Sequence, residues 1–507
     1  MERTRPIDGE LARLREEIEG YAKEFGLDYH PVVFEVCDYD TINILAAQGG
    51  FPTRYPHWRF GMDYDQLSKG YAYGLQKIYE MVVNTNPCYA YLLNANHLVD
   101  QKIVMAHVFG HADFFKNNAW FAGSDRNMMS VMANHGTKIR RYMEKYGQDK
   151  VEDFIDKVLS LENLIDPSGL FETPDVQRNR AKLIKEASTQ GSEGEDMNDG
   201  RSHALRSFMR SKTRDSATQG PKKPERDEDI SRVEDKLDVS ISRRDIMRYL
   251  LEYAPVKEWE ADIIGILREE AYYYLPQRMT KIMNEGWASY WHSTIMTTRA
   301  LRPSEIIDFA DHHAGVMAMS KQRLNPYKIG IELYRDIEYR WNTGRFGKEW
   351  LECDNLYDKE NWHRETNLGR QKIFDVRKSH NDVTFIDEFL TPDFCERQGI
   401  FTYKYNPRTG RNEIDSREFS EIKAKLLSSL TNFGQPVIEV ESGNYKNRGE
   451  LLLKHIHMGV DLDMNFAKET LRNIHAIWKR PVNILTTQED QEVNLVYDGR
   501  EFKSNTL

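Results

Sequence analysis

The chain has 507 residues, with 70 basic and 80 acidic side chains and a formal net charge of −10. This acidic balance argues against general nucleic-acid binding, and no apolar run approaches the roughly 20 residues that a membrane helix needs. The length is enough for a sizeable core divided into two or three domains. Because the first residues are charged and include no apolar signal segment, we expect a cytoplasmic protein without nucleic-acid or membrane partners.

The N-terminal part is predicted to be mainly helical. Residues 8–26 have apolar side chains at helical spacing, and Pro31–Asp38 is typical of a short strand or an extended entry. Residues 49–64 are rich in glycine, proline and aromatic residues, which predicts an ordered loop. In that loop His57 either lines a substrate groove or belongs to aromatic packing. We expect further helices over residues 65–83, 95–118, 124–145 and 150–163.

The helix expected over residues 95–118 carries His107 and His111 in the motif HVFGH. Residues four apart share one helical face, so two imidazoles there provide half of a tetrahedral zinc site, as in H-E-x-x-H enzymes. The glutamate of that motif is absent, since Val108 occupies its position. A chance match, or a hydrogen-bonded pair in the core, is the alternative interpretation.

The composition changes from about residue 187 to 230. This segment has few large apolar residues and mixed charge, so it cannot offset the entropy of becoming ordered. We predict a flexible polar insert between two halves of one helical domain.

Glu270 is predicted to face inward, because it lies on the apolar face of a helix that includes Trp259. It is a candidate substitute for the missing glutamate, as a general base, a metal ligand or an acceptor for a histidine N–H. A structural ion pair with Arg268, Arg278 or Arg299 is the alternative.

Residues 281–296 are apolar or aromatic nearly all round, which is typical of a buried helix. Glu285 and His292 lie two turns apart on it. A buried carboxylate without a partner is costly, and a metal held by His107 and His111 would satisfy Glu285. Two histidines four apart, with a glutamate on a later helix, form the ligand set of gluzincin-type metallohydrolases.

The motif DHHAGV places His312 and His313 next to each other, so the two rings point to different sides of a helix. One of them could bind substrate or orient a metal ligand; a solvated or capping role is the alternative. After about residue 380, strands and helices alternate, which predicts an α+β domain. Its His455 and His457 alternate along a strand and could bind a ligand or lie on an exposed sheet face.

Several of these motifs resemble the SpoVR family, which is named for stage V of bacterial sporulation and for spore cortex formation. The resemblance is carried by HVFGHADFFKNN, NEGWASYWH, NTNPCYAYLL, RYPHWRFG and DHHAGV, and it covers most of the chain except the polar insert. It implies a bacterial cytoplasmic protein, often encoded beside a serine protein kinase and a von Willebrand A-like protein. A biochemical activity does not follow from the resemblance.

The sequence therefore predicts an α+β protein. A mainly α-helical, gluzincin-like domain comprises residues 1–186 and 231–379, interrupted by the insert at 187–230, and a smaller α+β domain comprises residues 380–507.

The leading functional hypothesis is a zinc-dependent hydrolase of amide or peptide bonds, acting on a peptide or a cell-wall precursor. In this hypothesis His107, His111 and Glu285 hold the metal, Glu270 polarises the water and His292 stabilises the developing oxyanion. One alternative, favoured by Val108, is a non-catalytic regulatory or scaffold protein that works with the kinase and the von Willebrand A-like partner. A second is an iron-dependent oxidoreductase, because two histidines and a carboxylate also bind iron.

Overall fold

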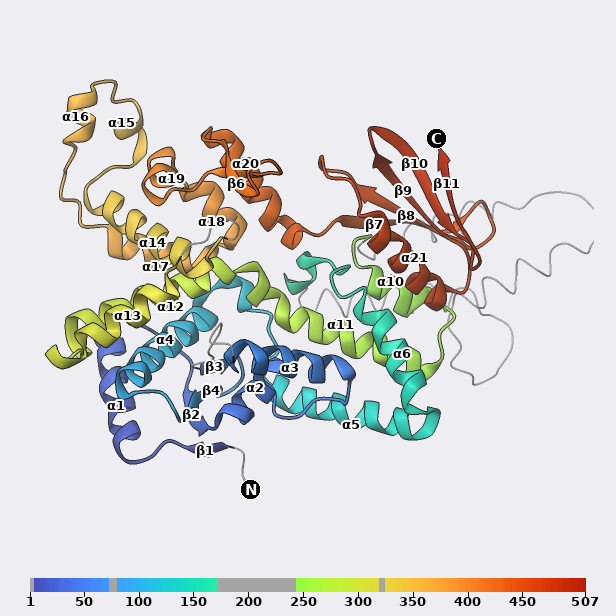
Figure 1. Cartoon of the computed structure of the whole chain (residues 1–507), viewed down its shortest axis with the longest axis horizontal. Coiled ribbons are helices and arrows are strands. Elements are labelled where there is room, and N and C mark those ends of the chain that lie inside the picture. Colours follow the sequence, from blue (N-terminus) through green and yellow to red (C-terminus); the bar gives the residue numbers. More distant parts are fainter. Residues whose placement is uncertain (1–3, 73–79, 172–242, 319–323) are drawn as a thin grey trace, which may run out of the picture. The chain divides into compact units, whose positions relative to one another are not determined.

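The computed structural model describes residues 4–72, 80–171, 243–318 and 324–507 (Figure 1). The chain divides into two compact units, one of residues 1–138 and 275–434 and the other of residues 139–274 and 435–507. Helices and sheets occur in both units, so the predicted α+β class is confirmed. The gluzincin likeness stays a prediction, and the predicted insert at 187–230 lies outside the described residues.

A four-stranded sheet forms the N-terminal part of the first unit, with strand order β1-β2-β4-β3. Strands β2 and β4 are parallel and the other pairs are antiparallel. The expected helix over 65–83 is wrong at its end, because Glu80–Val83 is a strand that pairs with β4. Two adjacent valines favour the extended conformation there. The strands are β1 (Thr4–Pro6), β2 (Val32–Cys37), β3 (Glu80–Val83) and β4 (Cys88–Leu93).

Helix α4 (Leu98–Asn117) is the centre of the first unit, and every residue from Val99 to Phe115 is buried. It packs against α12 (Lys281–Ile295), which in turn packs against α14 (Pro326–Asn342).

Glycines allow these helices to approach closely. A Cβ atom on Gly110 would lie 2.7 Å from the Cα atom of Ala288, and one on Gly286 would lie 2.4 Å from the Cα atom of Gly330. Real Cβ atoms do not make such short contacts, so glycine is required for this helix spacing. The spacing brings the histidine face of α4 up to α12.

The remaining elements of the first unit are mostly helices (Figure 1). Helix α1 confirms the helix predicted for residues 8–26. The helices are α1 (Gly9–Glu24), α2 (Tyr39–Ala47), α3 (Trp58–Ala72), η1 (Ala119–Phe121), η3 (Met296–Ala300, a π-helix), η4 (Pro303–Glu305), α13 (Ile306–Val316), α15 (Gly347–Leu351), α16 (Leu356–Glu360), α17 (Gly369–Ser379), α18 (Asp382–Phe389), α19 (Pro392–Gln398), α20 (Phe419–Leu430) and η5 (Thr431–Gly434), with a hairpin of β5 (Thr402–Asn406) and β6 (Arg411–Ser416).

The second unit contains a five-stranded sheet in the order β11-β10-β9-β8-β7. Helix α21 packs on β9 and β10 and buries Leu471, Ile474 and Ile477. The elements are α6 (Gln148–Leu159), η2 (Pro167–Phe171), α10 (Ile246–Tyr253), β7 (Val437–Tyr445), β8 (Glu450–Ile456), α21 (Met464–Trp478), β9 (Val482–Gln488), β10 (Gln491–Tyr497) and β11 (Phe502–Thr506). Helices α5 (Met128–Tyr146) and α11 (Glu258–Met279) each contain a boundary between the two units.

The division into units differs from the predicted domains. Residues 380–434, expected to belong to the C-terminal domain, belong to the first unit. The reason is apolar packing, because Phe385, Phe389 and Ile422 are part of the same buried cluster as the residues of α4 and α12. The sheet of the second unit thus begins only after residue 434.

In the part of the chain that the structure describes, no helix is both long enough and apolar enough to cross a membrane.

Candidate metal site

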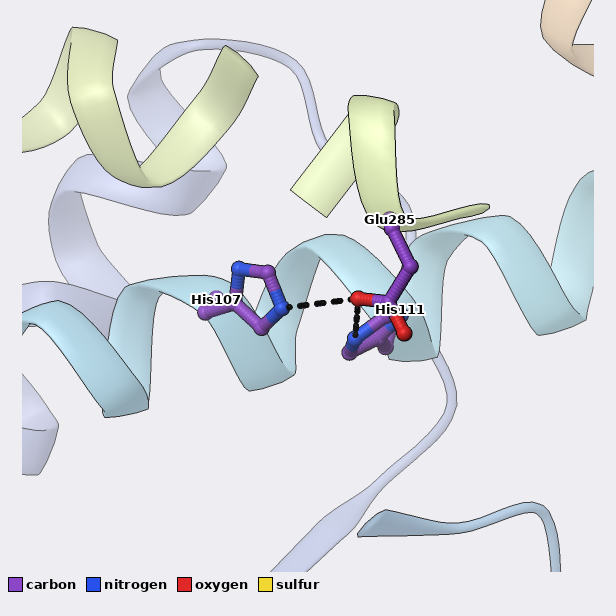
Figure 2. Close-up of side chains that lie close together, drawn as sticks. All are labelled: His107, His111 and Glu285. Carbon is purple, nitrogen blue, oxygen red and sulfur yellow. Dashed lines mark ion pairs between the residues drawn. The ribbon is translucent and has the colours of Figure 1, made fainter. Parts of the chain in front are cut away.

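Three residues predicted to act together lie together in the first unit. His107 and His111 project from one face of α4 and Glu285 points toward them from α12 (Figure 2). All three are buried, and one potential ligand atom from each lies within 4.8 Å of the other two. This is the kind of cluster that could hold a metal ion.

Glu285 Oε2 lies 3.4 Å from Nε2 of His107 and 3.4 Å from Nε2 of His111 (Figure 2). Both distances are longer than a good N–H···O hydrogen bond. Oε2 is buried and receives no well-formed hydrogen bond from any described residue. A buried carboxylate oxygen in this situation needs a positive charge beside it.

The outer nitrogens of both imidazoles are engaged. Nδ1 of His111 lies 2.9 Å from Oδ1 of Asn284, and Nδ1 of His107 lies 3.0 Å from Nδ1 of His292. Because the amide oxygen only accepts, Nδ1 of His111 is the donor in this contact, and Nε2 of the same ring faces Glu285. Second partners of this kind orient metal-binding histidines in proteins.

Burial and neighbouring charges set the protonation of the cluster. Burial, followed by the nearby His111, lowers the pKa of His107 to about 4. Burial by itself raises the pKa of Glu285, but the Lys281 ammonium and the two imidazoles outweigh it and hold that pKa well below its usual range. Lys281 donates to the other carboxylate oxygen, Oε1. At neutral pH the cluster therefore offers a neutral imidazole at His107 and a carboxylate.

Two residues near the cluster were missed in the sequence. Burial raises the pKa of Glu80, at the start of β3, to about 7, and the charges of His111 and Glu285 also act on it. The charge of Glu285, together with burial, raises the pKa of Tyr327 well above its usual range. The Tyr327 ring stacks on His107 with ring centroids 6.2 Å apart. No motif marks either residue, since both reach the site through tertiary packing.

The structure places the other predicted site residues differently. Glu270 is buried on the part of α11 that belongs to the second unit, and it is not among the residues that converge at the cluster. Its roles as base or ligand stay predictions. His292 is buried on α12, with one ring nitrogen bonded to His107. Val108 is fully buried in the apolar core.

The adjacent histidines of α13 point in different directions, as expected. His312 pairs with Asp100 of α4 at 3.0 Å. Nδ1 of His313 lies 3.4 Å from Nε2 of His292. In the second unit His455 bonds to Thr486, and His457 pairs with Asp461.

A second buried charged cluster lies further along α4. Asp113 pairs with Arg377 of α17 at 2.5 Å, and both side chains are almost completely buried. Asp113 also accepts hydrogen bonds from the indole N–H of Trp287 and the backbone N–H of Asp28, each at 2.8 Å. This carboxylate is satisfied by protein donors alone.

Comparison with known proteins identifies the family. Residues 8–435 match the SpoVR like protein family, and residues 436–489 match the SpoVR-like C-terminal domain. The chain therefore belongs to the SpoVR family. It is 27% identical to a protein of Escherichia coli (strain K12) named "Uncharacterized protein YcgB", over an alignment of 515 residues that covers 95% of this chain and 92% of that protein. No solved structure matches the chain significantly.

Proposed function

We propose that this protein is a zinc-dependent hydrolase of amide or peptide bonds, with the metal held by His107, His111 and Glu285. The observation that carries the proposal is the convergence of two imidazole nitrogens on one buried carboxylate oxygen that receives no well-formed hydrogen bond from the part of the chain that the structure describes. The contact with Asn284 places a proton on Nδ1 of His111, so a neutral His111 ring would offer the lone pair of Nε2 to a cation. A cation beside the carboxylate would be attracted by that lone pair and by the negative charge of Glu285.

The donor set is the reason that we propose zinc. Two imidazole nitrogens and a carboxylate oxygen are ligands that zinc commonly takes at catalytic sites with three protein ligands. The same set also suits the iron triad of two histidines and a carboxylate, so metal analysis of the purified protein distinguishes the two.

Bound zinc supplies Lewis acidity, which activates water and polarises a scissile carbonyl. The chain itself must then supply a proton acceptor, and Val108 cannot act as one. Glu80 is the acceptor that we propose, because its pKa of about 7 allows both protonation states near neutral pH. The charge of Glu285 and burial keep Tyr327 protonated, and its hydroxyl is a hydrogen-bond partner of Glu285, so Tyr327 would help to orient this ligand.

The substrate class is a peptide or amide, and a cell-wall precursor peptide is the candidate that a role in spore cortex formation suggests. The fully buried Val108 also supports a second candidate, a regulatory scaffold without chemistry, acting with a serine protein kinase and a von Willebrand A-like protein. The two candidates differ in one measurable property, which is turnover by the metal-loaded protein.

The metal is tested by analysing purified wild-type protein and the His107→Ala variant after dialysis. We expect one zinc per chain in the wild type and none in the variant, while His455→Ala, which removes a histidine of the second unit, keeps the metal. A wild-type protein that binds no divalent metal contradicts the proposal.

Hydrolysis is tested with amide and peptide substrates, including cell-wall precursor peptides. Glu80→Gln should keep zinc and lose roughly 10²–10⁴-fold in rate, the usual contribution of a positioned base. The wild-type rate should rise with pH through about 7, where Glu80 loses its proton, and Glu80→Gln should lack this dependence. Metal-loaded wild type that cleaves none of these substrates would favour the scaffold.

A further inference from the structure

We infer that a cavity between α14 and α19 binds the phosphate group of a small molecule. The cavity has a volume of about 110 Å³ and is lined by residues of these two helices. All of the lining residues belong to the first unit, and none of them is a residue of the proposed metal site. The inference is therefore independent of the proposed function.

The cavity is large enough for a phosphate group. One water needs about 10–15 Å³ of such volume, so there is space for several waters or for one small ion. The lining residues on each helix are three or four positions apart, so they share one face of that helix. Those that matter for recognition are Glu332, Arg335, Asp336 and Tyr339 of α14 and Phe394 and Arg397 of α19.

The positive groups of the cavity lie nearer to solvent than the negative groups. The side chain of Arg335 is 42% exposed, whereas that of its partner Glu332 is 20% exposed. The side chain of Arg397 is 56% exposed, whereas that of its partner Asp336 is 4% exposed. A ligand that enters from solvent therefore meets the guanidinium groups first, which favours an anion over a cation.

Basic side chains also outnumber acidic side chains in this group. Two carboxylates are shared by four basic residues, with Arg340 and Arg397 paired to Asp336, and Lys328 and Arg335 paired to Glu332. Two positive charges are thus in excess within the group. A phosphate monoester carries about −1.5 to −2 charges at pH 7, so one phosphate group would balance this excess.

Both guanidinium groups that line the cavity are held in place. Arg335 donates from Nη1 to Glu332 and from Nη2 to Ser293 of α12, at 3.0 Å each. Arg397 donates from Nη2 to Asp336 and from Nε to a backbone oxygen of α19, while its Nη1 donates to no residue that the structure describes. Donors that are fixed in this way lose little conformational entropy when a ligand binds.

Two arginines suit a phosphate group better than a carboxylate. A guanidinium pairs with either anion through two parallel N–H···O bonds. A carboxylate has only two oxygens, which one such pair occupies, whereas a phosphate monoester has three and can accept from Arg335 and Arg397 together. Tyr339 also lines the cavity and is 47% exposed, so it offers an aromatic ring to the group that carries the phosphate.

The test is isothermal titration calorimetry with inorganic phosphate, phenyl phosphate, acetate and methylammonium. The full-length protein is first freed of metal by dialysis, because phosphate can also bind a metal ion. We expect both phosphates to bind at one site per chain and acetate and methylammonium to bind much more weakly. Tighter binding of phenyl phosphate identifies a phosphate ester as the ligand, and equal affinities identify the free ion. Methylammonium that binds more tightly than both phosphates would overturn the inference.

Variants locate the binding site. Arg335→Gln and Arg397→Gln should each weaken phosphate binding by about 10–100-fold, as expected for the loss of a hydrogen bond to a charged group. Arg364→Gln is the matched control, because Arg364 is 54% exposed and pairs with a carboxylate but does not line the cavity. This control should bind phosphate as the wild type does.

Arg397→Lys keeps the charge and provides a second test should Arg397→Gln fail to fold. Lysine cannot form two parallel hydrogen bonds, so this variant should bind phosphate more weakly than the wild type. His107→Ala should bind phosphate normally, so a failure of the metal proposal would leave this inference intact. Absence of phosphate binding would overturn it. Equal binding by the wild type and the folded Arg335 and Arg397 variants would also overturn it, since the phosphate would then be an adventitious ion only.

Discussion

Two buried clusters lie along α4 and α12, and they differ in how many hydrogen-bond donors surround the carboxylate. The carboxylate of Asp113 is surrounded by donors, including the guanidinium of Arg377 and the indole of Trp287. Glu285 Oε2 faces two imidazole nitrogens and receives no well-formed hydrogen bond from the described residues. Burial alone therefore does not distinguish a structural ion pair from a candidate binding site; the balance of donors and acceptors does.

The largest expected difference between the clusters is in stability without metal. Asp113→Asn leaves the buried Arg377 without a countercharge and should lower the free energy of unfolding by about 3–5 kcal/mol. Glu285→Gln leaves behind Lys281, whose side chain is 57% exposed, so we expect a loss of less than about 1 kcal/mol. Urea unfolding in the presence of a chelator measures both. Equal losses would mean that the Glu285 cluster is also a structural ion pair.

The next largest expected effect is the pH dependence of the free energy of unfolding of the metal-free protein. The pKa of His107 is about 4 in the folded chain and 6.5 in the unfolded reference. Between these values the unfolded chain binds a proton that the folded chain does not, so stability falls as the pH drops from 6.5 toward 4. The shift corresponds to about 3 kcal/mol for metal-free protein, and His107 contributes no pH dependence above this range. Denaturant unfolding at several pH values should show a shallower slope in His107→Ala, and an unchanged slope would contradict the assignment.

For zinc affinity we expect the reverse order: a change at the Glu285 cluster should have the larger effect, and a change at the Asp113 cluster the smaller one. Glu285→Gln removes the charge of a proposed ligand. It should weaken zinc binding by more than roughly 100-fold, which is the upper end of the loss seen when a residue that hydrogen-bonds to a ligand is replaced. Trp287→Phe removes the indole donor to Asp113 and keeps an aromatic ring, so it should change zinc affinity by only a few-fold. Isothermal titration calorimetry compares the two variants. Equal zinc affinity in Glu285→Gln and the wild type would exclude Glu285 as a ligand.

The smallest expected effect concerns the spacing of the two helices. A methyl group on Gly110 would lie 2.7 Å from the Cα atom of Ala288, so Gly110→Ala should force α4 and α12 apart. We expect a loss of about 1–3 kcal/mol in stability, as for other overpacked cores, together with weaker zinc binding. Gly20→Ala is the matched control, because no atom lies within 4 Å of its added methyl group. Equal stability of Gly110→Ala and this control would show that the helix spacing can adjust.

The sequence predicts those features of the cluster whose geometry depends only on spacing along a helix. Residues four apart on a helix must share a face, and an inward glutamate on an apolar helix needs a partner, so His107, His111 and Glu285 were expected together. The structure brings them together, while the metal itself stays a prediction. Glu80 could not be found in this way, because the helix predicted over residues 65–83 includes it, whereas its approach to the cluster depends on the pairing of strand β3 in the sheet.

The role of His292 shows a second limit. Helical spacing placed it on the same face as Glu285, which suggested an oxyanion role. Which atom a ring nitrogen contacts depends on side-chain rotation and on the neighbouring helix, and neither can be read from one sequence. The domain boundary was missed for a similar reason, since residues 380–434 have an α+β pattern but bury their apolar side chains in the first core.

The ion pair between Lys281 and Glu285 has a consequence for ion selectivity. Lys281 lies one helical turn before Glu285 and occupies Oε1, so only Oε2 is left for a cation. A carboxylate restricted in this way cannot chelate through both oxygens. Calcium, which takes six to eight oxygen ligands and often a bidentate carboxylate, would find one oxygen and two nitrogens here. At the proposed metal site the lysine would thus discriminate against large, hard cations without touching the metal, and would leave the site to small ions that accept nitrogen ligands.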